Sequence, residues 1–332
     1  MTTMASPSPA SPQVPPTSDC VSERTSLTWD SFEERYTWDG GRRYHAYREG
    51  RYSLPNDETE QQREELLHIL VMDILEQELF LSPMEESPKK VLDLATGTGL
   101  WAIEMGDRYP DAEILGLDLS PIQPTSVPPN VSFQIDDIED TWVHDDDYDL
   151  IHMRESSGYM VSTPKVIESA FKHLKPGGWF ELQEFHWVAV QEDGTIDPKN
   201  PVNQYMDGMC AVGRREGRVI CIVPSVGDIM KNCGFVDVQK QTVRVPYGQW
   251  HADENQRKRG ACFTIVCELL MQPTQGLLAS IDWPSERIET LFASMSDMFR
   301  NDSIQCYATY YIWSGRRPEE NEDVGGKVGG SN

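Results

Sequence analysis

The stretch Val91–Trp101 has the sequence VLDLATGTGLW, and it decides the fold class of this chain. An apolar run is followed by Gly97 and Gly99, which flank a threonine, and then by a return to apolar residues. Glycines let the backbone turn sharply and let a ligand approach, and the N-terminus of a following helix adds N–H donors. The pattern therefore predicts a buried strand, a ligand-binding loop and a helix. Asp93, a carboxylate inside the predicted strand, is the unusual residue.

Apolar strands alternate with helical stretches after this point. The predicted strands are Val91–Leu94, Ile114–Asp118, Val131–Ile135, Leu150–Met153 and Trp179–Phe185. The predicted helices are Leu100–Arg108 and Lys165–Leu174. Such alternation is typical of a parallel sheet with helices on both faces. Four prolines in SPIQPTSVPPN, between the second and third strands, exclude a normal long helix there.

Other elements flank this region. Two further strands are predicted, FVDVQKQTVRVPY at 235–247 and CYATYYIWSG at 306–315, the second as a hairpin partner at the sheet edge. Further helices are predicted at Pro201–Glu216, Asn255–Met271 and Ser285–Phe299. Upstream, Asp57 with Glu60 three residues later resembles a capping box, and it precedes an amphipathic helix. Residues 1–26 and 318–332 are Pro/Ser/Thr-rich or Gly-rich and polar, which predicts disordered tails.

Charge and cysteine usage exclude several classes of protein. The formal net charge is −25, from 29 basic and 54 acidic residues, which argues against a nucleic-acid partner. The trio Arg214, Arg215 and Arg218 is interpreted as a solvated helix face. Seven cysteines without a CxxC pair, and without a signal-peptide pattern, favour free thiols in a reducing compartment. No apolar run reaches the roughly 18 residues that span a membrane, and no metal is expected.

The glycine loop leaves two classes of ligand open. Gly97, Gly99 and Ala102 satisfy the loose G-x-G-x-x-G/A pattern, which binds NAD or FAD through a pyrophosphate. S-adenosylmethionine instead carries an ammonium and a carboxylate. Asp93 would repel a pyrophosphate but would suit an ammonium, directly or through water. The simpler alternative is that Asp93 only caps the loop.

Three further acids follow predicted strands. Asp118 ends the second strand in LGLDLS, where a carboxylate can accept both ribose hydroxyls of either ligand, or cap a helix. Asp136 and Asp137 follow the third strand, where an acid can accept the exocyclic amine of adenine, with the backbone N–H of Ile138 facing the ring. These acids could equally be solvated turn residues.

These segments resemble class I S-adenosylmethionine-dependent methyltransferases. VLDLATGTGLWAIEMGDRYPDAEILGLDLSP (91–121) is similar to that family's first two motifs and LKPGGWFELQE (174–184) to its late one. More narrowly, YHAYREGRYSLPNDETEQQR (44–63), DDIEDTW (136–142) and YDLIHMRE (148–155) resemble the LaeA-like fungal methyltransferases. The resemblance implies an α/β, Rossmann-like sheet of seven mostly parallel strands, with an antiparallel edge hairpin, a helical N-terminal lid and a helical insertion. It places the lid and its helix at 27–89 and the methyltransferase domain, with helical insertions for the acceptor, at 90–317.

The resemblance also implies site residues for the cofactor, S-adenosyl-L-methionine. The expected cofactor-binding residues are Tyr52, Asp93, Ala95, Gly97, Thr98, Gly99, Asp118, Leu119, Asp136, Asp137, Ile138 and Arg154. Ala95 departs from the glycine of many relatives, but its methyl group is small. If the acceptor needs a base, the candidates are His152 and His186, the latter next to Glu184.

The methyl acceptor is not determined by these motifs. Tyr44, Tyr47 and Tyr52 are expected in a loop among arginines. They either line a lid over the cofactor, whose sulfonium favours aromatic faces, or pack structurally. Met206, Met209 and Trp250 either line an apolar acceptor pocket or belong to the core.

Two functions from different classes fit the motifs. The first is an enzyme that methylates an O, N or S atom of a small natural product or short peptide in fungal secondary metabolism. The second is a LaeA-like regulator that binds the cofactor and acts through protein partners. Asp93 makes a dehydrogenase the third choice. The expected location is the cytoplasm, or the nucleus for a regulator.

Overall fold

The computed structural model describes residues 36–143 and 147–322. The predicted N-terminal tail at 1–26 lies outside these ranges, as does most of the predicted tail at 318–332. Within the described ranges, no helix has the length and apolar character needed to cross a membrane.

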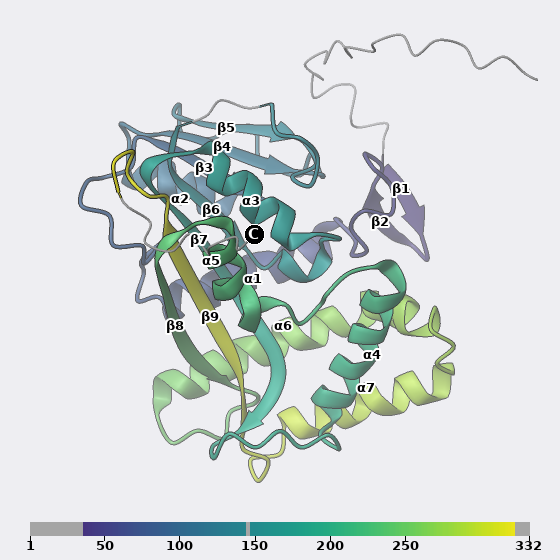
Figure 1. Cartoon of the computed structure of the whole chain (residues 1–332). Coiled ribbons are helices and arrows are strands. Elements are labelled where there is room, and N and C mark those ends of the chain that lie inside the picture. The colour runs from purple at the N-terminus through teal and green to yellow at the C-terminus, as the bar shows by residue number, and fades with distance from the viewer. Residues whose placement is uncertain (1–35, 144–146, 323–332) are drawn as a thin grey trace, which may run out of the picture.

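A seven-stranded sheet forms the centre of the molecule (Figure 1). Its strands are β3 (Lys90–Leu94), β4 (Glu113–Asp118), β5 (Val131–Ile135), β6 (Tyr148–Arg154), β7 (Leu174–Gln191), β8 (Val236–Pro246) and β9 (Cys306–Arg316). Their order across the sheet is β5-β4-β3-β6-β7-β9-β8. Only the pairs that include β9 are antiparallel. The predicted Rossmann-like, mostly parallel sheet is therefore confirmed.

The position of β9 corrects one detail of the prediction. β9 lies between β7 and β8, so β8 and not β9 forms the edge of the sheet. The two antiparallel strands are also not joined by a tight turn, because two long helices, α6 (Glu254–Ala279) and α7 (Ser285–Phe299), separate them in the chain.

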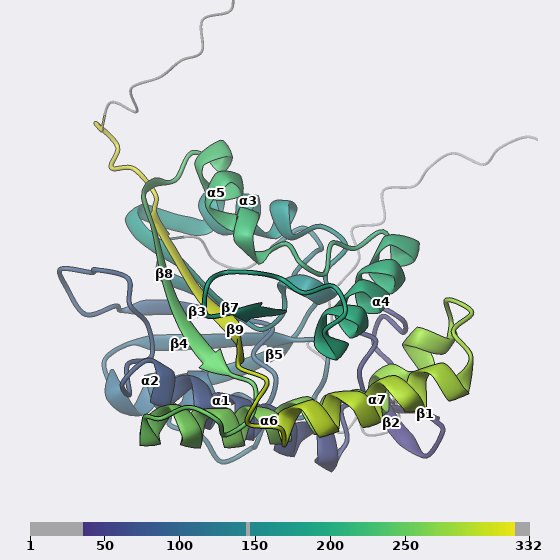
Figure 2. The ribbon, with the colours of Figure 1, turned by 90° about the horizontal axis from the view of Figure 1, so that it is seen from below.

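Helices cover both faces of the sheet, as Figure 2 shows from below. On one face α3 (Thr163–His173) and α5 (Val226–Cys233) pack on β7 and β8. On the other face lie α1 (Glu58–Ile74), α2 (Leu100–Arg108) and α6. Beyond the end of the sheet, α4 (Pro201–Glu216) packs with α6 and α7. α5 was not predicted, and α6 continues past the predicted end at Met271 because Pro273, Thr274 and Leu278 extend its buried side.

The central strand β3 shows why the fold requires an apolar run. Leu92 and Leu94 pack into the core under α3 and α5, while Val91 packs into the core with Trp101 and Met105 of α2. All three β3 side chains are fully buried. A strand that is buried on both faces cannot alternate polar and apolar residues, as is usual in parallel sheets.

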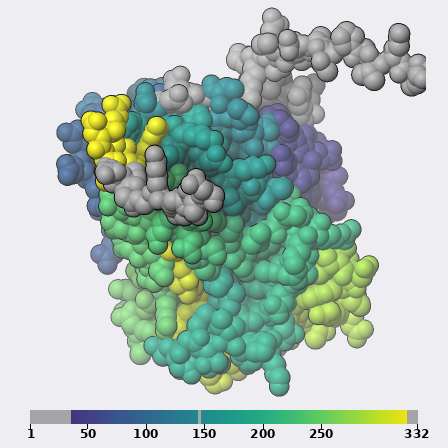
Figure 3. Space-filling model, in the orientation of Figure 1, coloured from purple at the N-terminus to yellow at the C-terminus, as the bar shows by residue number. Residues whose placement is uncertain are grey.

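The described chain begins with a small hairpin, β1 (Tyr36–Asp39) and β2 (Arg42–His45). This hairpin corrects the prediction that Tyr44 lies in a loop, because Tyr44 is on β2. The hairpin is the purple flank beside the teal surface in the space-filling view (Figure 3). It is tied to the start of α1 by two contacts between Arg42 and Asp57, Nε–Oδ2 at 2.5 Å and Nη2–Oδ1 at 2.8 Å.

Asp57 also caps α1 as predicted. Its Oδ1 accepts a hydrogen bond from the backbone N–H of Glu60 at 3.2 Å. The side chain of Glu60, which would complete a capping box, instead accepts a hydrogen bond from Nε of Arg63 at 2.7 Å. The cap is therefore supplied by Asp57.

Substitution of Asp57 by alanine is expected to lower the free energy of unfolding by about 1–2 kcal/mol, because it removes the cap and the Arg42 contact. Urea unfolding measures this loss. Asp57→Asn is the matched control, since asparagine also caps helices, and it should lose less. The Arg42 hydrogen bond lowers the pKa of Asp57. The stability that the Asp57 carboxylate contributes is therefore fully present above the ordinary carboxyl pKa, and it is lost as pH falls through the lowered pKa. An unchanged midpoint for Asp57→Ala would contradict this account.

Candidate functional site

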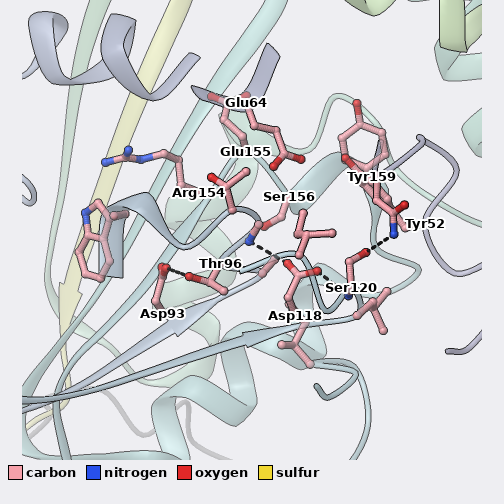
Figure 4. A pocket seen from close by; sticks show the side chains of 18 of the residues that line it. Tyr52, Glu64, Asp93, Thr96, Asp118, Ser120, Arg154, Glu155, Ser156 and Tyr159 are labelled. Carbon is pink, nitrogen blue, oxygen red and sulfur yellow. Dashed lines mark hydrogen bonds between the residues drawn. The ribbon is translucent and has the colours of Figure 1, made fainter. Parts of the chain in front are cut away.

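A cavity opens at the carboxyl ends of β3, β4, β5 and β6 (Figure 4). The space inside it, part of which is open to solvent, amounts to about 1250 Å³. The chain runs from β3 outward to β4 and β5 on one side, and to β6 and β7 on the other. In open α/β sheets, ligands bind at this point of reversal. Most predicted cofactor residues line the cavity: Tyr52, Asp93, Ala95, Gly97, Thr98, Asp118, Leu119, Asp136, Asp137, Ile138 and Arg154.

Gly99 does not line the cavity. It allows the turn of the loop and packs against Phe133. It is the N-cap of α2, with φ of 82°. A Cβ atom there would lie 2.5 Å from Cζ of Phe133, so only glycine fits. Ala95 also has a positive φ, 54°. Its methyl group costs on the order of 1 kcal/mol in this conformation, a cost that a glycine would not have.

Asp118 holds the glycine loop to the end of β4. Its Oδ2 accepts from the backbone N–H of Gly97 at 2.8 Å, and its Oδ1 accepts from the backbone N–H of Ser120 at 2.8 Å. Burial raises the pKa of Asp118 to about 6, although these two hydrogen bonds oppose the rise. Each carboxylate oxygen keeps capacity for a second donor, so Asp118 can still accept ligand hydroxyls.

Asp93 has partners within the protein. Its Oδ2 accepts from Oγ1 of Thr96 at 2.5 Å, and its Oδ1 lies 2.7 Å from Nδ1 of His152. The ring of His152 stacks on Trp101 with centroids 3.7 Å apart. Burial lowers the pKa of His152, so the ring is neutral and donates from Nδ1 to Asp93. His152 borders the cavity, but its fully buried, clamped ring favours a positioning role over the predicted role of base.

His186 lies elsewhere. It is on β7 opposite Thr309 of β9, its ring meets the edge of Tyr311, and it does not line the cavity. Its predicted role as a base at this site is therefore corrected.

Of the two alternatives for Met206, Met209 and Trp250, the acceptor pocket is not the one observed. Met206 and Met209 are each 6% exposed and belong to the core around α4, α6 and α7. Trp250 packs against Tyr307 with ring centroids 5.0 Å apart. None of these three borders the cavity described above.

The segment between β2 and α1 closes one side of the cavity. Nε of Arg51 lies 3.0 Å from Oδ2 of Asp137, and Arg48 forms an ion pair with Asp140. The rings of Tyr52 and Tyr159 pack edge-on with their centroids 5.0 Å apart. Figure 4 shows both side chains on the same side of the cavity.

Arg218 also supports this segment. It donates to the backbone O of Gly50 at 3.1 Å and to Oγ of Ser53 at 3.4 Å. It is 6% exposed, whereas Arg214 and Arg215 face solvent. The prediction of a solvated helix face therefore fails for Arg218.

The turn after β5 brings its two acids to the same cavity. Oδ1 of Asp136 accepts from the backbone N–H of Asp137 at 2.9 Å. Oδ1 of Asp137 accepts from the backbone N–H of Glu139 at 3.0 Å. Both carboxylates are buried, so the alternative of solvated turn acids does not hold.

In the cavity, Glu64 and Arg154 each keep a buried side-chain atom, Oε2 and Nη2, that has no hydrogen-bond partner in the described ranges. Burial raises the pKa of Glu64 to about 8, and a Cβ atom on Gly97 would lie 2.9 Å from its Oε2. Arg154 donates from Nε to Gln183 Oε1 at 2.9 Å and from Nη1 to His68 Nδ1 at 3.2 Å. The cavity thus offers an acid and a cation to a ligand that carries both an ammonium and a carboxylate.

Glu155 was missed in the sequence. It follows β6 directly, with φ of 50°, and its Oε1 accepts from the backbone N–H of Phe185 at 2.9 Å. Burial and the nearby Glu184 raise the pKa of Glu155 well above the ordinary value. Figure 4 places Glu155 near Glu64, on the side of the cavity away from Asp118. The signal available was an acid two residues after the predicted strand Leu150–Met153, in YDLIHMRE.

Comparison with known proteins identifies the family. Residues 62–240 match the methyltransferase domain family. The chain is 36% identical to the methyltransferase pytC of Aspergillus terreus, over 91% of this chain and 94% of pytC. It is 32% identical to the secondary metabolism regulator LAE1 of Cochliobolus heterostrophus, over 85% and 95%. It is also 32% identical to the protein-methionine methyltransferase laeA of Emericella nidulans, over 87% and 78%. The chain belongs to the methyltransferase family, together with these fungal proteins.

Proposed function

We propose that this chain transfers a methyl group from S-adenosylmethionine to an O, N or S atom of a small molecule or short peptide in fungal secondary metabolism. The observation that carries the proposal is the cavity itself, in which Oε2 of Glu64 and Nη2 of Arg154 have no hydrogen-bond partner and Asp118 stands where it can accept ribose hydroxyls. The similarity to pytC over nearly all of both chains supports an enzyme.

The lining residues fit the three parts of this cofactor. Asp118 would accept the ribose hydroxyls, and the turn at Asp136–Ile138 would receive the adenine. Arg154 would pair with the carboxylate of the methionine part, and Glu64 with its ammonium. Asp93 then acts through Thr96 and His152, whose positions it fixes. The cofactor supplies an electrophilic methyl group when bound.

The acceptor would enter from the side lined by Tyr52, Glu155, Ser156, Tyr159 and Met160. Methyl transfer is an in-line displacement, so the main task of these side chains is to place the acceptor atom and exclude water. A hydroxyl or amine acceptor must also lose a proton. We assign Glu155 as the base that accepts this proton, because its raised pKa suits a base and because His186 does not line the cavity. We further propose that the segment from Tyr44 to Asp57 acts as the lid.

Calorimetry tests the cofactor assignment. S-adenosylmethionine and S-adenosylhomocysteine are expected to bind, and NAD is not, because Asp93 lies directly before the glycine loop and would repel a pyrophosphate there. Binding of NAD with no response to either sulfur ligand would overturn the assignment.

An acceptor panel tests the reaction. S-adenosylhomocysteine formation would be followed by mass spectrometry with phenols, hydroxy acids, amines, thiols and methionine peptides. A thioether has no proton to lose, so turnover of methionine peptides alone would favour the chemistry named for the relative laeA and would remove the need for Glu155.

A regulatory role is the second candidate, because relatives at 32% identity are named secondary metabolism regulators. A stable complex recovered from fungal nuclei, with no turnover of any acceptor, would favour it. Free thiols fit either proposed location, the cytoplasm for an enzyme or the nucleus for a regulator.

A further inference from the structure

Two cysteines, one on α4 and one in the loop that follows it, lie side by side. Sγ of Cys210, on α4, lies 3.2 Å from Sγ of Cys221, and both side chains are partly exposed. The helix ends at Gly217, with φ of 75°, and the backbone N–H of Arg218 donates to the O of Gly213 at 2.8 Å. This turn folds the chain back along the helix, which brings Cys221 to Cys210.

The loop between the two cysteines is tightly packed. A Cβ atom on Gly213 would lie 2.6 Å from Cγ1 of Ile220. The loop can therefore pack this closely against α4 only because residue 213 is a glycine. A Cβ atom on Gly158 would lie 3.1 Å from the backbone O of Ile220. Gly158 belongs to the short 3₁₀ helix η2 (Ser157–Tyr159), whose Tyr159 lines the cofactor cavity.

The same loop holds the proposed lid. Arg218 makes the two hydrogen bonds to Gly50 and Ser53 described above. The cysteine pair therefore closes a loop that contacts the cavity wall through Ile220 and the lid through Arg218. Formation of a bond between the two sulfur atoms can therefore affect both the cavity wall and the lid.

The two thiols are chemically unequal. The hydrogen bond from Sγ of Cys221, together with the charge of Arg214, lowers the pKa of Cys210 to about 7. The thiolate is the form that attacks a disulfide, and a thiol with a pKa near the ambient pH is an effective attacker. Cys233 and Cys262, which are also partly buried, have raised pKa values because of burial.

We propose that Cys210 and Cys221 form a reversible disulfide by exchange with a low-molecular-weight disulfide such as oxidised glutathione, and that this bond fastens the lid. The Cys210 thiolate attacks one glutathione sulfur and releases the other glutathione as a thiolate. Cys221 then attacks the mixed disulfide, loses its proton to solvent and releases the second glutathione. The protein is oxidised by two electrons and oxidised glutathione is reduced to two thiols. The sulfur atoms move from 3.2 Å to about 2.05 Å apart.

Thiol trapping tests the bond in the full chain. The protein is equilibrated in glutathione buffers of increasing oxidised fraction, alkylated, digested and measured by mass spectrometry. The Cys210–Cys221 disulfide is expected to form in less oxidising buffer than any modification of Cys233 or Cys262. A mixed glutathione disulfide at Cys210 with no internal bond would overturn the proposal, and so would alkylation of both cysteines at every ratio.

Hydrogen exchange tests the effect on the lid without methyl transfer. Oxidation is expected to slow exchange at residues 50–53 and 157–159 and to slow the release of S-adenosylhomocysteine several-fold. Cys210→Ser and Cys221→Ser should show neither response, while the matched control Cys262→Ser should respond as the unchanged protein does. A disulfide that forms but leaves exchange at both segments unaltered would overturn the link to the lid. Because trapping needs no cofactor, its result is independent of the proposed methyl transfer.

Discussion

Replacement of Asp118 by alanine is expected to weaken the binding of S-adenosylmethionine by about 10- to 150-fold, the equivalent of about 1.5–3 kcal/mol for hydrogen bonds to a charged group. Two losses combine. The ribose hydroxyls lose their acceptor, and the backbone N–H groups of Gly97 and Ser120 lose the carboxylate that holds the glycine loop in place. The fold should survive, because Asp118 lies at the end of β4 and faces the cavity.

Calorimetry at several pH values measures the effect. Burial raises the pKa of Asp118 to about 6, and only the carboxylate accepts on both oxygens, so affinity in the unchanged protein should fall as pH drops through that value. Asp107→Ala, an exposed acid on α2, is the matched control and should change nothing. A dissociation constant for Asp118→Ala equal to that of the control would remove Asp118 from the site.

Replacement of Glu155 by glutamine is expected to reduce kcat by about 100- to 10,000-fold for an acceptor that must lose a proton. Glutamine keeps the size of the side chain and can still accept from the backbone N–H of Phe185, but it cannot take a proton. Cofactor affinity should change little, because other residues are assigned to the three parts of the cofactor.

The pH profile separates a base from a structural residue. The raised pKa of Glu155 means that the carboxylate forms only as pH rises, so kcat in the unchanged protein should increase with pH and then level off. The Glu155→Gln protein should lack this rise, whereas Glu113→Gln, an exposed control on β4, should keep it. A Glu155→Gln protein with normal kcat and a normal profile would show that the acceptor needs no base there.

Local sequence patterns predicted most of the elements that build the site. α2, α4, α7 and β5 have the predicted bounds, because each is bracketed by turn residues or helix caps that act over a few positions. The glycine loop and its acids were predictable for a similar reason. A carboxylate at the end of a parallel strand lies at the edge where ligands bind, whichever side chains surround it.

Features that depend on distant contacts could not be predicted in this way. Asp93 lines the cavity, but its hydrogen-bond partner His152 is on β6, 59 residues away, and no local pattern signals that pairing. Glu155 and Glu184 gain their raised pKa values only because β6 and β7 lie side by side and both acids are buried. The burial of Arg218 likewise depends on a contact with Gly50, 168 residues earlier. Periodicity within a segment carries no information about such pairs.

The place of β9 affects how the chain can fold as it is synthesised. β9 pairs with β7 on one side and with β8 on the other, and Tyr310 lies opposite both Phe185 and Val243. On the ribosome, both partners are made before the strand that joins them. Until Cys306–Arg316 emerges, β7 has an open edge and β8 has no neighbour in the sheet. Until then the nascent chain has a long unpaired strand edge that can pair with other chains. Chaperones are therefore most useful at this stage of synthesis.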